Sequence, residues 1–71
     1  MIWFFGRDGE SLHVEMRYER AVREFSLLIG EPHGDRHERF SDLASCRGRL
    51  VELENQLATN RWIRGPSGVS A

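Results

Sequence analysis

Hydrophobic and polar residues alternate in the N-terminal half of the chain in the manner of β-strands. One stretch has an apolar residue at every second position, namely Leu12, Val14, Met16 and Tyr18. This alternation is typical of a strand with one covered face. The pair Asp8-Gly9 separates the stretch from the apolar run IWFF, and Asp-Gly favours a tight hairpin because both residues tolerate positive φ. The pattern predicts paired strands over residues 2–6 and 11–18.

The next segment fits two patterns. Its apolar residues can form a helical stripe, and Glu19 and Arg23 are spaced for an i,i+4 ion pair. Period-2 alternation up to Ile29, in the strand-forming run FSLLI, instead favours a turn near residues 19–22 and a third strand over residues 22–30. We prefer the strand, although the segment ERAV holds no typical turn residue, so the helical alternative stays open.

Turn residues recur in the segment GEPHGDRHERF. Pro32 presets φ for a β-turn and Gly34 can adopt a positive φ, which predicts a turn over residues 32–35 and a fourth strand over residues 36–40. Ser41 can then cap a helix that we expect over residues 42–60. The helix carries one apolar stripe, formed by Leu43, Cys46, Leu50, Leu53 and Leu57.

These elements define an α+β fold, a small four-stranded antiparallel β-meander followed by one C-terminal helix. Residues 1–64 form a single domain, and the small and polar residues 65–71 are expected to be a disordered tail. A single helix can cover one face of such a sheet only. The second face is then exposed or buried by another chain.

The chain length points to self-association. A domain of 71 residues buries only about 60% of the surface of its unfolded chain, so its core is small. Its one cysteine, Cys46, cannot form an internal disulfide. We therefore expect that a homodimer supplies the stability that the small core lacks. The sequence contains no membrane-spanning apolar run and no signal-peptide pattern, which predicts a cytoplasmic protein.

The first strand is apolar on both faces, which suggests a binding surface. We expect exposed aromatic side chains at Trp3, Phe5 and Trp62 to bind a second copy of the chain or a larger protein. The sequence thus favours a small, soluble, non-enzymatic protein–protein interaction module that is homodimeric. A small inhibitor or accessory subunit of a larger enzyme is an alternative of the same size.

Nucleic-acid binding is a second alternative, because all ten basic residues are arginine and none is lysine. Arginine suits phosphate and base recognition. The candidate residues for such contacts are Arg17, Arg23, Arg61 and Arg64, which lie near aromatic residues in the sequence or in the C-terminal segment. The net charge of −1 provides no overall attraction to nucleic acid, and a coding bias towards arginine would produce the same composition.

Little in the sequence resembles catalysis or cofactor binding. His33, Asp35 and His37 alternate as a metal-binding triad would on an extended segment, but the predicted turn breaks that alignment, so we predict no metal site. Cys46 lies on the apolar stripe of the helix, where a buried structural role is expected. No nucleotide-binding or hydrolase motif occurs, and we expect neither a cofactor nor enzymatic activity.

Overall fold

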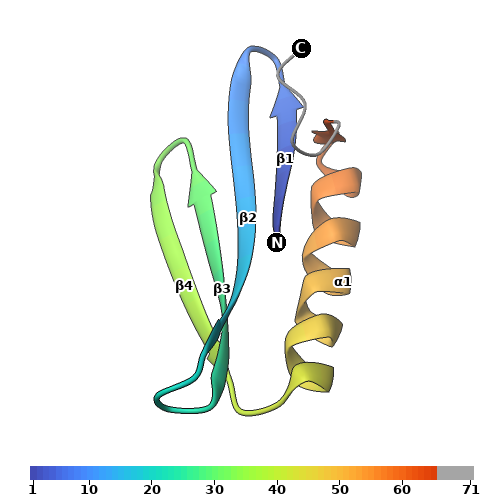
Figure 1. The fold of residues 1–71 in the computed structure, drawn as a ribbon. Helices are drawn as coiled ribbons and strands as arrows, with labels where there is room; N and C mark the ends of the chain where they lie inside the picture. The colour runs from blue at the N-terminus through green and yellow to red at the C-terminus, as the bar shows by residue number, and fades with distance from the viewer. Residues whose placement is uncertain (66–71) are drawn as a thin grey trace.

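The computed structural model describes residues 1–65 as an antiparallel sheet with one helix packed on one face (Figure 1). The architecture is α+β, and a meander of four strands precedes the helix as the sequence predicts. A short fifth strand follows the helix. The predicted tail lies outside the described residues except for Gly65, whose N–H donates to the Phe4 carbonyl at 2.8 Å.

The first hairpin joins β1 (Ile2–Arg7) to β2 (Glu10–Glu19). Its loop consists of Asp8 and Gly9, which have φ angles of 49° and 79°. This positive-φ pair is the conformation that Asp-Gly favours. The register places Trp3 opposite Val14 and Phe5 opposite Leu12, so these side chains share one face of the sheet.

Strand β3 (Glu24–Glu31) follows β2 through a turn, which confirms the predicted strand-turn-strand arrangement and excludes the helical alternative. The turn lies one residue later than predicted, at residues 20–23, because β2 continues to Glu19 and β3 begins at Glu24. Arg23 adopts a φ of 53° there. The segment offers no glycine or asparagine, so an arginine takes the left-handed conformation.

Strand β4 (Gly34–Phe40) begins two residues earlier than predicted. Only Pro32 and His33 form the turn. Gly34 has a φ of 146°, a backbone conformation that residues other than glycine rarely adopt. The expected turn over residues 32–35 was therefore too long. Asp35 consequently belongs to the strand.

Helix α1 (Leu43–Thr59) begins one residue later than predicted and is capped by Asp42, not by Ser41. The Asp42 carboxylate accepts hydrogen bonds from the Ser45 backbone N–H at 2.7 Å and from the Ser45 hydroxyl at 3.0 Å. After the helix, Arg61 with a φ of 67° reverses the chain. The short strand β5 (Ile63–Arg64) then pairs with β1.

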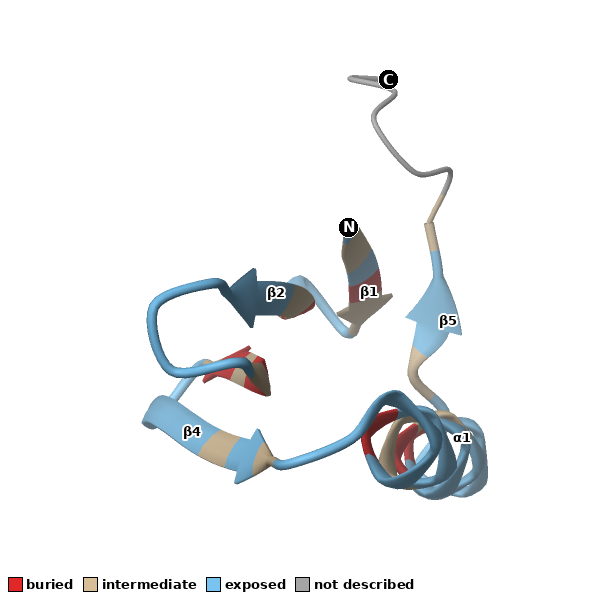
Figure 2. Ribbon diagram, turned by 60° about the horizontal axis from the view of Figure 1, so that its bottom comes forward, coloured by how far each residue is buried: buried red, intermediate tan, exposed pale blue. Residues whose placement is uncertain are grey.

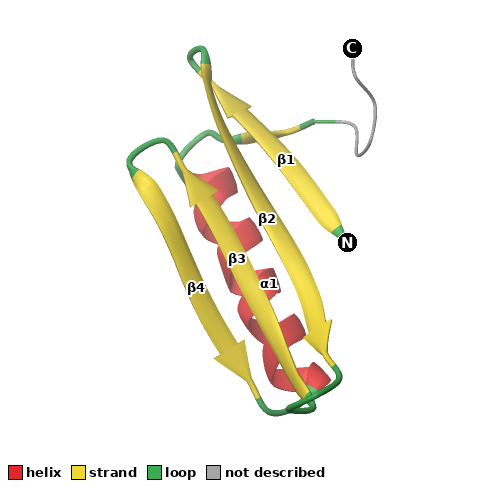
Figure 3. Ribbon diagram, turned by 60° about the vertical axis from the view of Figure 1, so that its left-hand side comes forward, coloured by secondary structure: helices red, strands yellow, loops and turns green. Residues whose placement is uncertain are grey.

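The strand order is β4-β3-β2-β1-β5, with β4 at one edge. Helix α1 lies along one face of the sheet, and the core fills the space between them (Figures 2 and 3). The buried apolar residues are Phe5, Leu12, Val14, Leu27, Ile29, Cys46, Leu53 and Leu57. We call the other side of the sheet the open face; within residues 1–65 no helix or strand covers it.

Candidate interaction surface

The three aromatic residues expected to form an exposed surface lie on the helix side of the sheet. Phe5 is 6% exposed and belongs to the core. Trp3 and Trp62 are partly buried and pack against that core. The expectation of an exposed aromatic surface was wrong for Phe5, because its register with Leu12 directs it towards α1.

Trp62 is held in place by the chain itself. The Arg7 guanidinium lies 4.4 Å from the centre of the Trp62 ring, a cation–π geometry. Arg7 also donates a hydrogen bond to the Asn60 carbonyl at 3.0 Å. These contacts fix the segment after α1 against the first hairpin, so Trp62 closes one end of the core.

Other apolar residues are exposed on the open face. Phe4 is 43% exposed, and it lies between the inward-facing Trp3 and Phe5. Ile63 of β5 is 74% exposed and pairs with Gly6. Because strand side chains alternate, Phe4 and Ile63 occupy the face away from the helix. The open face is therefore apolar along β1 and β5.

The centre of the open face is covered by an imidazole ring. His13 lies opposite Gly30, and a Cβ atom added to Gly30 would come 2.6 Å from His13 Nδ1. The ring thus fills the space that the missing side chain leaves. Phe4 lies beside it, with ring centroids 6.3 Å apart.

The four arginines considered for nucleic-acid binding come from separate places. Arg17 of β2 is 3.0 Å from Glu15, and its hydrogen bond holds the pKa of Glu15 below its ordinary value. Arg64 is 3.7 Å from Glu54 of the helix. Arg23 lies in the β2–β3 turn and Arg61 follows α1, at opposite ends of the molecule (Figure 1).

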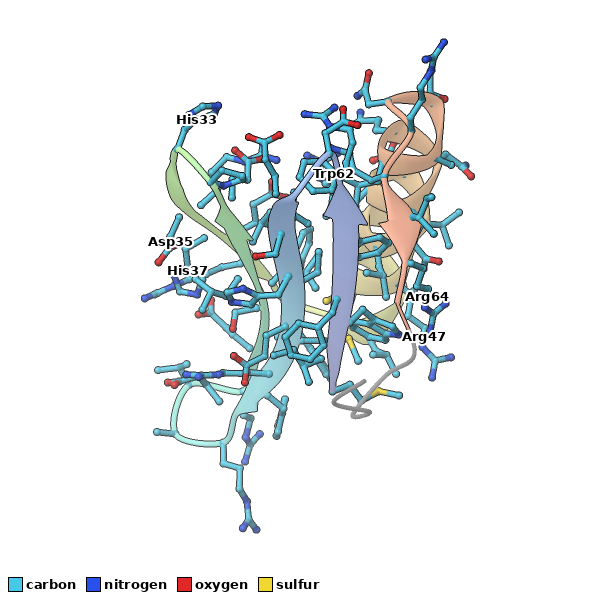
Figure 4. All side chains as sticks on the ribbon, turned by 90° about the horizontal axis from the view of Figure 1, so that it is seen from above. His33, Asp35, His37, Arg47, Trp62 and Arg64 are labelled. Atoms are coloured by element: carbon cyan, nitrogen blue, oxygen red, sulfur yellow. The ribbon has the colours of Figure 1, made fainter. Side chains whose placement is uncertain are left out.

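The His33, Asp35 and His37 triad is divided between two structural elements. His33 is in the turn at the tip of the hairpin, whereas Asp35 and His37 are on β4 (Figure 4). Asp35 and His37 do share a face, because β4 starts at Gly34. No group of three potential metal ligands occurs within residues 1–65.

The outer edge of β4 exposes backbone groups in a pattern that the register defines. Met1 and Met16 exchange backbone hydrogen bonds of 2.8 and 3.2 Å, so even-numbered residues of β2 bond to β1. Antiparallel ladders alternate, and odd-numbered residues of β2 therefore bond to β3. Carried across the sheet, this alternation directs the N–H and C=O groups of Asp35, His37 and Arg39 outwards from β4.

Two half-open clefts lie against the sheet. One of about 250 Å³ on the open face is lined in part by Arg17, Val22, Ser26, Leu28, His37 and Arg39. The other, of about 270 Å³, lies between the end of α1 and the sheet and is lined in part by Arg7, Leu12, Ile29, Leu53, Gln56 and Trp62. Both are smaller than the roughly 300 Å³ at which ligand pockets usually begin.

Cys46 is fully buried on the side of α1 that faces the core, as we expected. Burial raises the pKa of its thiol. A nucleophilic cysteine requires the opposite, a lowered pKa and an accessible sulfur atom. Its position is that of a small core residue.

Two features of this surface were missed in the sequence. The exposure of Phe4 follows from the alternation that places His13 on the polar face, since these two residues pair. The sequence predicts the edge strand over residues 36–40, but it does not show that Asp35 belongs to the same strand and completes the alternating charges of DRHER.

No protein-family model matches the chain, and no curated protein or solved structure is significantly similar to it. Within residues 1–65, helix α1 is neither long enough nor apolar enough to cross a membrane.

Proposed function

We propose that the chain is a small, non-catalytic interaction module that associates with a second copy of itself through parts of the sheet that α1 leaves uncovered. The observation that carries this proposal is that, within residues 1–65, one helix covers a sheet of five strands. Phe4 and Ile63 are exposed on the open face, and β4 presents a free edge of seven residues. Apolar patches and free strand edges are the features through which sheets associate.

The burial of Cys46 and the division of His33 from Asp35 and His37 support a non-catalytic role. Catalysis needs a nucleophile or an acid–base pair in a concave site. The buried thiol is protected from substrate, and the two clefts described above are smaller than typical ligand pockets. Binding by surface complementarity places no such demand on the fold.

Sedimentation velocity over protein concentrations from about 1 to 300 μM tests the proposal. We expect a reversible shift from monomer to dimer within this range. A chain that remains monomeric at the highest concentration contradicts it. Binding to a larger protein without self-association, or retardation of mixed DNA and RNA at low salt, would instead support the alternatives.

A further inference from the structure

We propose that two copies of the chain pair antiparallel along their β4 edges, about a two-fold axis at His37, so that two sheets become one. This inference rests on the proposed self-association and adds the surface and the register. The axis is perpendicular to the sheet. Both helices therefore lie on the same side of the joined sheet, and both open faces lie on the other.

The backbone of β4 is suited to this pairing. Asp35, His37 and Arg39 direct their N–H and C=O groups away from β3. An axis at His37 places this residue opposite His37 of the second copy, and Asp35 opposite Arg39 of the second copy. All outward-facing groups of the three residues then find partners, in about six backbone hydrogen bonds.

The side-chain charges are complementary in the same register. The segment DRHER pairs with its own reverse so that every acidic residue meets a basic one. Asp35 faces Arg39 of the second copy on the open face, and Arg36 faces Glu38 of the second copy on the helix side. Opposite charges directly across a strand pair stabilise it.

Neighbouring registers bring like charges together. An axis moved by one residue to position 36 pairs Arg36 with itself, and an axis at position 38 pairs Glu38 with itself. Like charges directly opposite each other are destabilising. The charge pattern of β4 thus selects the axis at His37 over the symmetric alternatives on either side.

The open-face charges have weak competing partners within residues 1–65. The Asp35 carboxylate takes part in none of the hydrogen bonds or ion pairs of this region, and Arg39 approaches only Glu24, at 3.9 Å. On the helix side, Arg36 is 2.8 Å from Glu31, and Glu38 is bound by Arg49 at 2.8 Å. Pairing there extends two existing ion pairs into a network.

Charged residues on an edge strand usually prevent copies from pairing. That protection requires repulsion, and the alternating signs of DRHER cancel in the antiparallel arrangement. An edge of seven residues buries less area than a standard interface. We therefore expect a dissociation constant on the order of 10 μM. Added salt should weaken the dimer, because the charged pairs across the two β4 edges are exposed.

Charge reversal provides the test. Asp35→Arg and Arg39→Asp each place like charges opposite one another twice across the axis, and each should weaken dimerisation about ten- to thirtyfold. An equimolar mixture of the two variants restores opposite charges in every pair, so it should form a heterodimer with an affinity near that of the wild type. Both positions are exposed, and circular dichroism checks that the fold is retained.

Arg47→Glu is the matched control, because Arg47 lies on the helix, on the opposite side of the molecule from His37 (Figure 4). It should leave the dimer unchanged. A dimer that survives both β4 variants but is lost on Phe4→Asp overturns the edge pairing and retains the proposed self-association. Single variants that dissociate without combining in the mixture also overturn the edge pairing. A chain monomeric under all conditions overturns both proposals.

Discussion

Gly30 and His13 act as a pair at the centre of the open face. The imidazole covers the glycine backbone, and a Cβ atom at residue 30 would overlap the ring. Covering an otherwise bare glycine with a cross-strand aromatic ring is a known means of stabilising a sheet. The glycine is therefore favourable only because the histidine is present.

We predict that Gly30→Ala destabilises the protein by about 1 kcal/mol when His13 is present, because the ring must turn out into solvent. In a His13→Ala background the same substitution should stabilise by about 0.5 kcal/mol, since alanine restricts the unfolded chain more than glycine does. Urea denaturation of the wild type, Gly30→Ala, His13→Ala and the double variant measures the coupling energy between the two residues. Equal effects of Gly30→Ala in both backgrounds would show that the ring and the glycine are independent.

The helix cap shows how far a single residue can be predicted. Ser41 and Asp42 are both good capping residues, and the sequence alone does not rank them. Asp42 takes the role because its backbone is extended, with φ −141° and ψ 160°, and its carboxylate reaches the Ser45 N–H. That hydrogen bond lowers the pKa of Asp42. The start of the helix was thus predictable to within one residue, and the capping group was not.

At the scale of elements, prediction succeeded where turn chemistry was explicit. Asp8-Gly9 determined the first hairpin, whereas the turn that ends at Arg23 was misplaced by one residue because nothing in ERAV marks its end. The expected exposure of Phe5 was wrong for a different reason. The first strand is apolar on both faces, and only the pairing of Phe5 with Leu12 determines which of those faces lies against the helix. The register of a strand with apolar residues on both faces is a tertiary property.

An ion pair between Glu38 and Arg49 links β4 to α1. Arg49 donates hydrogen bonds to both carboxylate oxygens of Glu38, at 2.8 and 3.2 Å. Both side chains are about one-quarter exposed, so the pair is partly shielded from water. The hydrogen bonds from Arg49 hold the pKa of Glu38 below its ordinary value of 4.5. The edge strand therefore depends on charge for part of its attachment.

We predict that Glu38→Gln lowers the free energy of unfolding by about 1 kcal/mol at neutral pH. Because the folded-state pKa of Glu38 is lowered, this stabilisation is present above pH 4.5 and is lost as the pH falls through the folded-state value. Denaturation at low micromolar concentration, where dimers do not contribute, should show the two proteins converging in acid. A difference that persists undiminished at pH 2 would assign the effect to packing.

For the whole molecule, the small core and the free edge are connected. Within the part of the chain that the structure describes, eight buried apolar residues provide the core, and a domain of this size is only marginally stable by itself. Association of folded chains shifts the folding equilibrium by mass action, because unfolded chains have no β4 edge to pair. The stability of the protein should therefore depend on its concentration.

We predict that the melting temperature of the wild type rises by about 2–5 °C for each tenfold increase in concentration above the dissociation constant. Differential scanning calorimetry at three concentrations measures the slope. Below about 100 μM, where these variants should stay monomeric, Asp35→Arg and Arg39→Asp should each melt at a temperature independent of concentration, and their equimolar mixture should recover the slope of the wild type. Since neither residue lies in the core, recovery in the mixture would attribute the gain in stability to charge pairing across the β4 edge. A wild-type melting temperature that does not change with protein concentration would contradict this prediction. It would mean that the small core is sufficient to stabilise the monomer without a partner.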